Sequence, residues 1–266
     1  MKKIILFLIF GAFLFSSNAV VGGDMPETPL FYRINIDKEI GATTWGYMQK
    51  GYDEARKAGA AAIILRLNTY GGTVVHADSI RTLILNSSMP VYAFIDNNAI
   101  SCDSIYMREG ANIGAATVVN QTGKAMPDKY QSYMRATIRS TAEAQGYDTV
   151  YTVSGDTEVH WRRNPQIAEA MVDERIVVPG LCDSTKVLTL TAREALQWGY
   201  CEAIAESVDD IITSRIGYWQ YKVEQFEPSF YDDLVGFLQN PVVQGILIML
   251  IIGGIYFEIQ TPGVGF

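Results

Sequence analysis

The fold is decided by the stretch at residues 61–72, which reads AAIILRLNTYGG. Its first part, residues 61–67, is a short apolar run with the length of a buried strand in a parallel sheet. The glycine pair Gly71 and Gly72 then opens a turn before residues 77–86, which have the apolar spacing of a helix. This stretch therefore predicts a β-strand that leads into a helix through a glycine turn.

Strand-like and helix-like segments alternate on both sides of this stretch. Apolar or β-branched runs predict further strands at residues 31–36, 91–95, 187–190 and 201–205. Apolar spacing predicts further helices at residues 43–58, after residues 127–128, and from Thr191, where Glu194 completes a capping box. Strands separated by such helices are typical of βαβ units. We therefore predict an α/β domain with a mainly parallel sheet, in which residues 63–67 and 91–95 are buried neighbouring strands.

Composition excludes several classes of protein. The chain has 266 residues, of which 48% are hydrophobic, enough for one α/β domain and additional targeting segments. Its net charge of −8 and the lack of a basic cluster argue against nucleic-acid binding. Three cysteines without close spacing and two histidines give no disulfide framework and no metal-site pattern. We expect neither a metal nor a cofactor.

Residues 1–19 have the three parts of a secretory signal peptide. Lys2 and Lys3 give a basic start, residues 4–15 are almost wholly apolar, and small residues precede a cleavage point after Ala19. The alternative is an uncleaved anchor helix, for which the apolar run is short. We predict export of the chain across the membrane.

A second apolar run, at residues 242–257, contains Gln244 as its polar residue. About 20 helical residues cover the ~30 Å of a bilayer core, so we predict a transmembrane helix at residues 241–260. The α/β domain then occupies residues 27–225 and a linker residues 226–240. A buried core helix is the alternative, disfavoured because apolar residues surround the helix on all sides. We expect this span to be cut off from a longer membrane region.

Two features could place chemistry at the ends of strands. Gly71 and Gly72 follow the strand at residues 61–67, where backbone N–H groups could stabilise an oxyanion; the alternative is an ordinary turn. Ser101 follows the strand at residues 91–95, where it could act as a nucleophile if a base took its proton; the alternative is a surface serine.

Lys129 stands at the start of an amphipathic helix. The N-terminal end of a helix disfavours a cation, which would lower the pKa of the lysine. Its neutral amine could then serve as the base that Ser101 requires. The alternative is a solvated lysine on the surface. We expect Lys129 to point toward the strand-end cleft that Gly71, Gly72 and Ser101 would share.

Taken together, these segments resemble the protease domain of the NfeD family, the operon partners of stomatins, within the Clp-protease/crotonase superfamily. The resemblance covers most of residues 27–266. It is carried by the blocks LNTYGG at 67–72, DNNA at 96–99, GANIGAA at 110–116, PDKY at 127–130, LTLT at 188–191 with EAL at 194–196 and Gly199, and YFEIQTPG at 256–263. The order and spacing of the blocks make the set specific.

The resemblance implies a membrane-anchored, ATP-independent serine endopeptidase that cleaves hydrophobic segments of membrane proteins, stomatin-like proteins among them. It implies Ser101 as the nucleophile, Lys129 as the base, and Gly71 and Gly72 as oxyanion donors. It also implies a homo-oligomer in the cell membrane, with the protease domain on the extracytoplasmic side.

One departure from the family concerns the nucleophile. In the family the nucleophilic serine lies in an Ala-Ser-Ala-Gly stretch that opens a helix, whereas Ser101 directly precedes the strand-like residues 102–107. About eight residues, or two helical turns, are missing. The alternative function is therefore a catalytically impaired, membrane-tethered binding or scaffold relative.

Two further enzyme classes have less support. A hydrolase based on His76 or His160 lacks a nucleophile-elbow motif beside either histidine. An acyl-CoA enzyme of the crotonase type is opposed by the export signal at residues 1–19.

Overall fold

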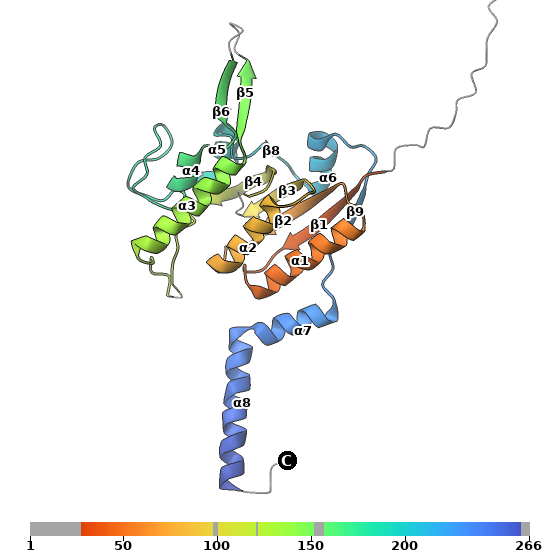
Figure 1. Ribbon diagram of the computed structural model, residues 1–266, viewed down its shortest axis with the longest axis vertical. Helices are drawn as coiled ribbons and strands as arrows, with labels where there is room; N and C mark the ends of the chain where they lie inside the picture. Colours follow the sequence, from red (N-terminus) through yellow and green to blue (C-terminus); the bar gives the residue numbers. More distant parts are fainter. Residues whose placement is uncertain (1–27, 98–100, 121, 152–156, 262–266) are drawn as a thin grey trace, which may run out of the picture.

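A computed structural model describes residues 28–97, 101–120, 122–151 and 157–261 (Figure 1). Its main sheet has seven strands in the order β7-β4-β3-β2-β1-β9, and β8 also pairs with β4. The strands are β1 Leu30–Ile36, β2 Ala62–Asn68, β3 Val91–Asn97, β4 Ser104–Gly114, β7 Thr189–Thr191, β8 Ala203–Ile204 and β9 Lys222–Gln225. All pairings are parallel except that of β4 with β7. The expected α/β class with a mainly parallel sheet is confirmed.

The central strands alternate their side chains between two apolar layers. In β2, Ile63 and Leu65 belong to one buried cluster, and Ala62 and Ile64 to the other. A strand buried on both faces has a continuous run of apolar residues. This run is the reason why the sequence alone predicts the strand. The expected parallel pairing of β2 with β3 is confirmed, with Ile63 opposite Val91.

Helices cover both faces of the sheet. The larger cluster packs under α1, α2 and α3, and the smaller one under α6 and the following π-helical turn. The helices of the domain are α1 Ala42–Lys57, α2 Val74–Leu85, α3 Asp128–Ala144, α4 Pro165–Ala170, α5 Ala192–Gln197 and α6 Val208–Asp210, continued by the π-helix Ile211–Ile216. The predicted capping box between Thr191 and Glu194 is present at the start of α5.

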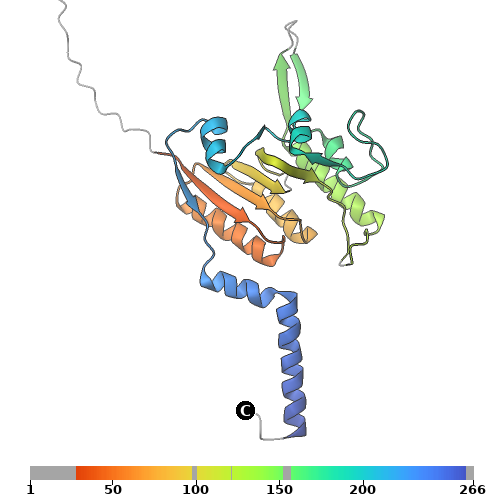
Figure 2. The ribbon, with the colours of Figure 1, turned by 180° about the vertical axis from the view of Figure 1, so that it is seen from behind.

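Three segments differ from the sequence prediction. An antiparallel hairpin, β5 Tyr147–Tyr151 and β6 Thr157–Trp161, rises away from the sheet (Figures 1 and 2). The strands expected at residues 187–190 and 201–205 shrink to β7 and β8, and β7 is antiparallel. These short edge pairings depend on distant partners, so local propensity does not define them.

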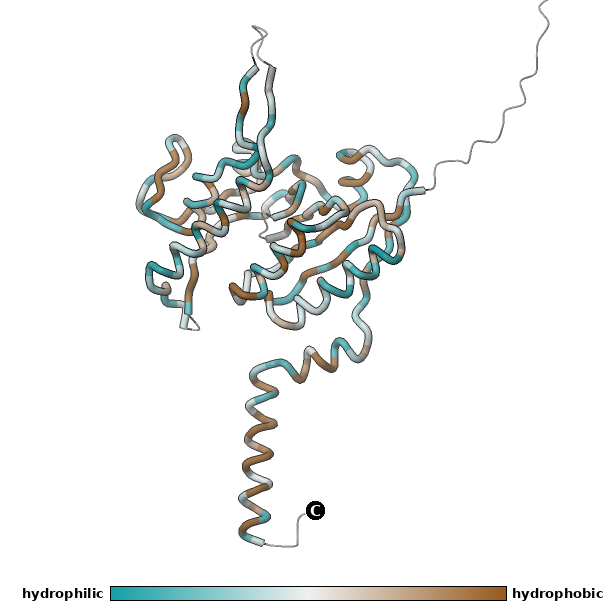
Figure 3. Tube along the Cα trace, viewed as in Figure 1, coloured by the Kyte–Doolittle hydropathy of each residue, from teal (hydrophilic) through white to brown (hydrophobic). Residues whose placement is uncertain are grey.

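The C-terminal part continues as two helices outside the α/β domain. Residues 226–240, expected as a linker, contain the helix α7 Phe230–Gln239, which begins with a capping box at Ser229. The helix α8 Pro241–Gln260 follows at the expected place and has no buried residue. Figure 3 shows that it is hydrophobic along most of its length. Within the described residues it is the one helix long and apolar enough to cross a membrane. The signal peptide expected at residues 1–19 lies outside the described residues.

Candidate functional site

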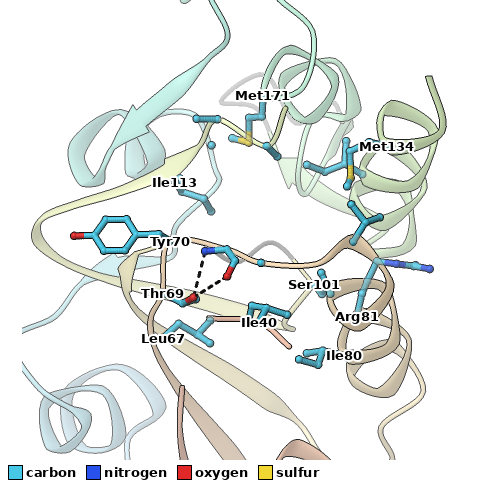
Figure 4. A pocket seen from close by; sticks show the side chains of 18 of the residues that line it. Ile40, Leu67, Thr69, Tyr70, Ile80, Arg81, Ser101, Ile113, Met134 and Met171 are labelled. Atoms are coloured by element: carbon cyan, nitrogen blue, oxygen red, sulfur yellow. Dashed lines mark hydrogen bonds between the residues drawn. The ribbon is translucent and has the colours of Figure 1, made fainter. Parts of the chain in front are cut away.

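An apolar cavity of about 380 Å³ lies between the sheet, α2 and α3 (Figure 4). Its walls come from the end of β2 and the glycine turn, from α2, from the segment after β4 and from α3. The lining includes Leu67, Gly71, Gly72, Ile80, Arg81, Ser101, Ile113, Val118, Met134, Ile138 and Met171. Arg81 is the charged side chain among the lining residues, and Asp78 pairs with it at 2.8 Å. The cavity therefore suits an uncharged, apolar ligand.

The glycine turn requires both of its glycines. The Ile40 N–H donates to the Gly71 carbonyl at 2.8 Å, and the Thr73 N–H donates to the Ile40 carbonyl at 2.9 Å. A Cβ on Gly72 would lie 2.1 Å from the Ile40 oxygen, and Gly71 has a φ of +105°. A side chain at either position would break this close pairing or strain the backbone.

The two expected oxyanion donors are not equivalent. The Gly71 N–H donates to Thr69 Oγ1 at 3.2 Å, so the threonine hydroxyl occupies it. The Gly72 N–H makes no hydrogen bond with any residue that the structure describes. Gly72 is therefore the available donor. Thr69, which directly follows β2, is a site residue that sequence reasoning missed although its position could have indicated it.

The opposite wall is held in an unusual backbone conformation. Ala115 has a φ of +51°, rare for a residue with a side chain. Its N–H donates to the Leu188 carbonyl at 2.9 Å, and the Ala116 N–H donates to the Met171 carbonyl at 2.7 Å. These bonds fix the wall to the segments before β7 and after α4.

Ser101 lines the same cavity as the glycine pair. Figure 4 shows it beside Ile80 and Arg81, apart from the turn that contains Thr69. Its hydroxyl makes no hydrogen bond within the described ranges of the chain. Ser101 thus lies at the cavity, but none of the described residues that line the cavity is a base.

Ser101 and the glycine pair lie toward different ends of the sheet, which corrects the expectation of a shared strand-end cleft. Asp103, two residues after Ser101, donates its N–H to the carbonyl of Val91, the first residue of β3. Gly71 and Gly72 instead follow the far end of β2. Ser101 and the glycine pair therefore reach the cavity from opposite ends of the parallel strands.

Lys129 is exposed and is not among the residues that line the cavity. Its ammonium lies over the ring of Tyr130, 4.8 Å from the centroid. The cavity face of α3 is made by Met134 and Ile138, and five and nine residues separate these from Lys129. At 3.6 residues per turn, Lys129 falls on the opposite side of the helix. The expected inward orientation of Lys129 is thus not what the structure shows.

A buried arginine holds the chain directly behind Ser101. The Arg163 side chain is fully buried, and its Nη1 donates to the Cys102 carbonyl at 2.6 Å. Its Nη2 donates to Glu202 Oε1 at 3.2 Å. Burial lowers the pKa of Arg163, opposed by Glu202, and burial raises the pKa of the Cys102 thiol to about 12. No local pattern signals Arg163, because a buried arginine looks like a surface one in sequence.

The mainly parallel sheet with helices on both faces defines the chain as an α/β domain with an apolar cavity beside the sheet. A solved structure of 1510-N, a membrane-bound stomatin-specific protease, as a lysine-to-alanine mutant in complex with a substrate peptide, has the same fold. It matches 80% of this chain and 98% of that chain, with a TM-score of 0.63 and 23% identity. The 1510-N protease specific for a stomatin homolog from Pyrococcus horikoshii matches 80% of this chain and 100% of that chain, with a TM-score of 0.58 and 22% identity.

Sequence comparison shows which proteins the chain is similar to. Residues 30–161 match the family model of the NfeD1b N-terminal domain. The chain is 29% identical to the membrane protein NfeD1b of Bacillus subtilis over 97% of its length, and 25% identical to the membrane-bound protease PH1510 of Pyrococcus horikoshii over 99%. It spans 57% and 59% of the lengths of these relatives. The resemblance to the NfeD family that the sequence predicts is confirmed.

Proposed function

We propose that this chain is the membrane-anchored domain of an ATP-independent serine endopeptidase that acts on hydrophobic segments of membrane proteins. The observation that carries the proposal is that Ser101 and the glycine pair line one apolar cavity. The protease name of the archaeal relative supports it. Since a solved neighbour is called stomatin-specific, we include stomatin-like proteins among the substrates.

The proposed chemistry is acyl transfer in two steps. The Ser101 hydroxyl attacks the scissile carbonyl while the Lys129 amine takes its proton, and the Gly72 N–H stabilises the oxyanion. Collapse breaks the peptide bond, and the lysine returns the proton to the leaving amine. Water then attacks the acyl-enzyme by the same route and releases the serine.

This chemistry requires the site to close. Both Lys129 and the glycine pair stand away from Ser101 without substrate, and catalytic contacts in free enzymes often form only in the complex. Binding of a peptide in the cavity would have to bring the Ser101 hydroxyl, the Gly72 N–H and the Lys129 amine to the same scissile carbonyl. The closure is therefore part of the proposal.

Cleavage of a peptide with an apolar centre and a fluorophore–quencher pair tests the activity. The full chain in detergent micelles should cleave it, and Ser101→Ala should abolish cleavage. Ser140→Ala, on the exposed side of α3, is the matched control and should keep full activity. Equal rates for all three chains would reject Ser101 as the nucleophile.

A second candidate is a membrane-tethered binding or scaffold domain without activity. The observation that favours it is that Lys129 is exposed and does not line the cavity that contains Ser101. It predicts that the same peptide binds in the cavity, that Met134→Arg blocks binding, and that no product forms.

We further propose that the domain lies on the extracytoplasmic side and that the chain forms a homo-oligomer.

A further inference from the structure

Helix α7 separates polar and apolar side chains onto opposite sides. Asp232, Asp233, Gly236 and Gln239 recur at helical spacing and form one side. The other side is made by apolar and aromatic residues that are all exposed: Phe230, Tyr231, Leu234, Val235, Phe237 and Leu238. Phe230 is 76% and Phe237 60% exposed. Such a surface on a ten-residue helix needs a partner.

The polar side of α7 is fixed to helix α1. Asp232 forms an ion pair with Lys50, and Tyr47 donates its hydroxyl to Asp233 Oδ1 at 2.9 Å. A Cβ on Gly236 would lie 2.8 Å from Thr43 Cγ2, so the glycine permits a close approach of the two helices. These contacts set the rotation of α7 and turn its apolar side away from the α/β domain.

The junction with α8 determines what meets that apolar side. Asn240 ends α7 and also caps α8, accepting the Val242 N–H at 2.9 Å, so no linker separates the helices. Figure 1 shows α7 running across the end of α8. The 20 residues of α8 rise about 30 Å, the thickness of a bilayer core. If α8 spans the membrane, Asn240 and α7 lie at its boundary.

We propose that α7 is an interfacial helix whose apolar side inserts into the headgroup and acyl boundary of the membrane. This inference rests on the proposed membrane anchoring by α8. Residues 230–239 contain no lysine or arginine, and both aspartates face α1, so the lipid-facing side is uncharged. Binding then comes from apolar burial and needs no anionic lipid.

The arrangement also orients the candidate site. α1 and α2 cover the same face of the sheet, and the cavity opens between that face, α2 and α3. Because α7 joins α1 to the membrane boundary, the face of the sheet that α1, α2 and α3 cover, which contains the cavity, stays close to the lipid surface. Apolar segments that leave the bilayer would therefore reach the cavity over a short path.

Quenching by brominated lipids tests the proposal on the full chain in phosphatidylcholine vesicles. A tryptophan is introduced by Phe237→Trp on α7, by Leu250→Trp within α8, or by Val177→Trp on the exposed surface of the domain. The wild-type chain, which has the same four native tryptophans, provides the background emission. Bromines are placed either near the headgroups or near the bilayer centre.

We expect shallow bromines to remove about half of the added Phe237→Trp emission, in high salt as in low salt, and to leave that of Val177→Trp unchanged. Deep bromines should quench Leu250→Trp. If Leu250→Trp is quenched but Phe237→Trp is not, the interfacial helix is rejected and the anchor stands. If the emission of Phe237→Trp is shifted to the blue but is not quenched, protein rather than lipid covers α7. That result would also reject the interfacial helix. An unquenched Leu250→Trp would reject the anchor and this inference together.

Discussion

The Arg163 guanidinium donates a hydrogen bond to the carbonyl oxygen of Cys102 over 2.6 Å and thereby fixes the residue that follows Ser101. The same guanidinium reaches Glu202 at 3.2 Å, and Glu202 accepts the Ile105 N–H. The buried Arg163 side chain, which precedes α4, therefore connects the start of β4 with the segment before β8 by hydrogen bonds. The position of Ser101 depends on this network rather than on a helix.

Arg163→Met should destabilise the domain by about 3 kcal/mol, because it leaves a buried carbonyl and a carboxylate without their main donor. Urea unfolding of the detergent-solubilised chain measures this. Arg162→Met is the control, since Arg162 pairs with Glu202 at 3.6 Å from a more exposed position, and it should change stability by less than about 1 kcal/mol. Similar losses in the two variants would contradict the assigned role of Arg163.

The two glycines of the turn should respond differently to alanine. Gly71→Ala meets no atom but must adopt a φ of +105°, which costs about 1–3 kcal/mol. Gly72→Ala should cost more, because its Cβ would collide with the Ile40 oxygen at 2.1 Å. Thermal unfolding of both variants shows which one loses more stability. A larger loss of stability in Gly71→Ala would show that the glycine turn does not pair with Ile40 in this way.

The sequence predicts the centre of this fold better than its edges. β2 and β3 are buried on both faces, so their apolar runs and the glycine turn are local signals of a parallel sheet. The hairpin β5–β6, the short strands β7 and β8, and α7 were missed or misjudged. Their formation depends on partners distant in sequence or on an exposed surface that composition does not distinguish from a linker.

The site was only partly predictable for the same reason. The sequence indicates Ser101 and the glycine pair because each follows a predicted strand, and both line the cavity, although they reach it from different ends of the strands. The orientation of Lys129 depends on which face of α3 packs inward, and Met134 and Ile138 decide that. Arg163 acts through burial that no local pattern shows.

Lys129→Ala tests the proposed base. Because Lys129 is exposed, we expect stability to change by no more than about 0.5 kcal/mol. Peptide cleavage should nevertheless fall by about 10²–10⁴, the contribution of a general base. Lys124→Ala, at another exposed lysine nearby, should keep the activity. Unchanged cleavage by Lys129→Ala would place the base elsewhere.

Acid should weaken the contact between α3 and the segment after α4 through Asp173, which forms an ion pair with Arg135. Its side-chain hydrogen bond from Arg175, together with Arg135 of α3, lowers the pKa of Asp173 from 3.8 to about 2. A carboxyl group with a lowered pKa stabilises the folded state at any pH above its ordinary pKa. This stabilisation is lost as the pH falls from about 4 to about 2. The shift corresponds to on the order of 2 kcal/mol.

Asp173→Asn should remove this dependence on pH. Unfolding midpoints in urea, measured from pH 6 down to pH 2, should fall more steeply for the wild-type chain than for Asp173→Asn. Parallel curves for the two chains would show that Asp173 is not linked to the acid transition.

Covalent labelling with a fluorophosphonate tests the central claim most directly. An activated serine attacks the phosphorus and expels fluoride, whereas an unassisted serine does not react at neutral pH. With a fluorophosphonate that carries an apolar peptide and so fills the cavity as a substrate would, the full chain in detergent should carry the label on Ser101 by peptide mass spectrometry, and both Ser101→Ala and Lys129→Ala should prevent labelling. A folded chain that binds the apolar peptide but takes no label on Ser101 would contradict the peptidase and leave the binding domain as the function.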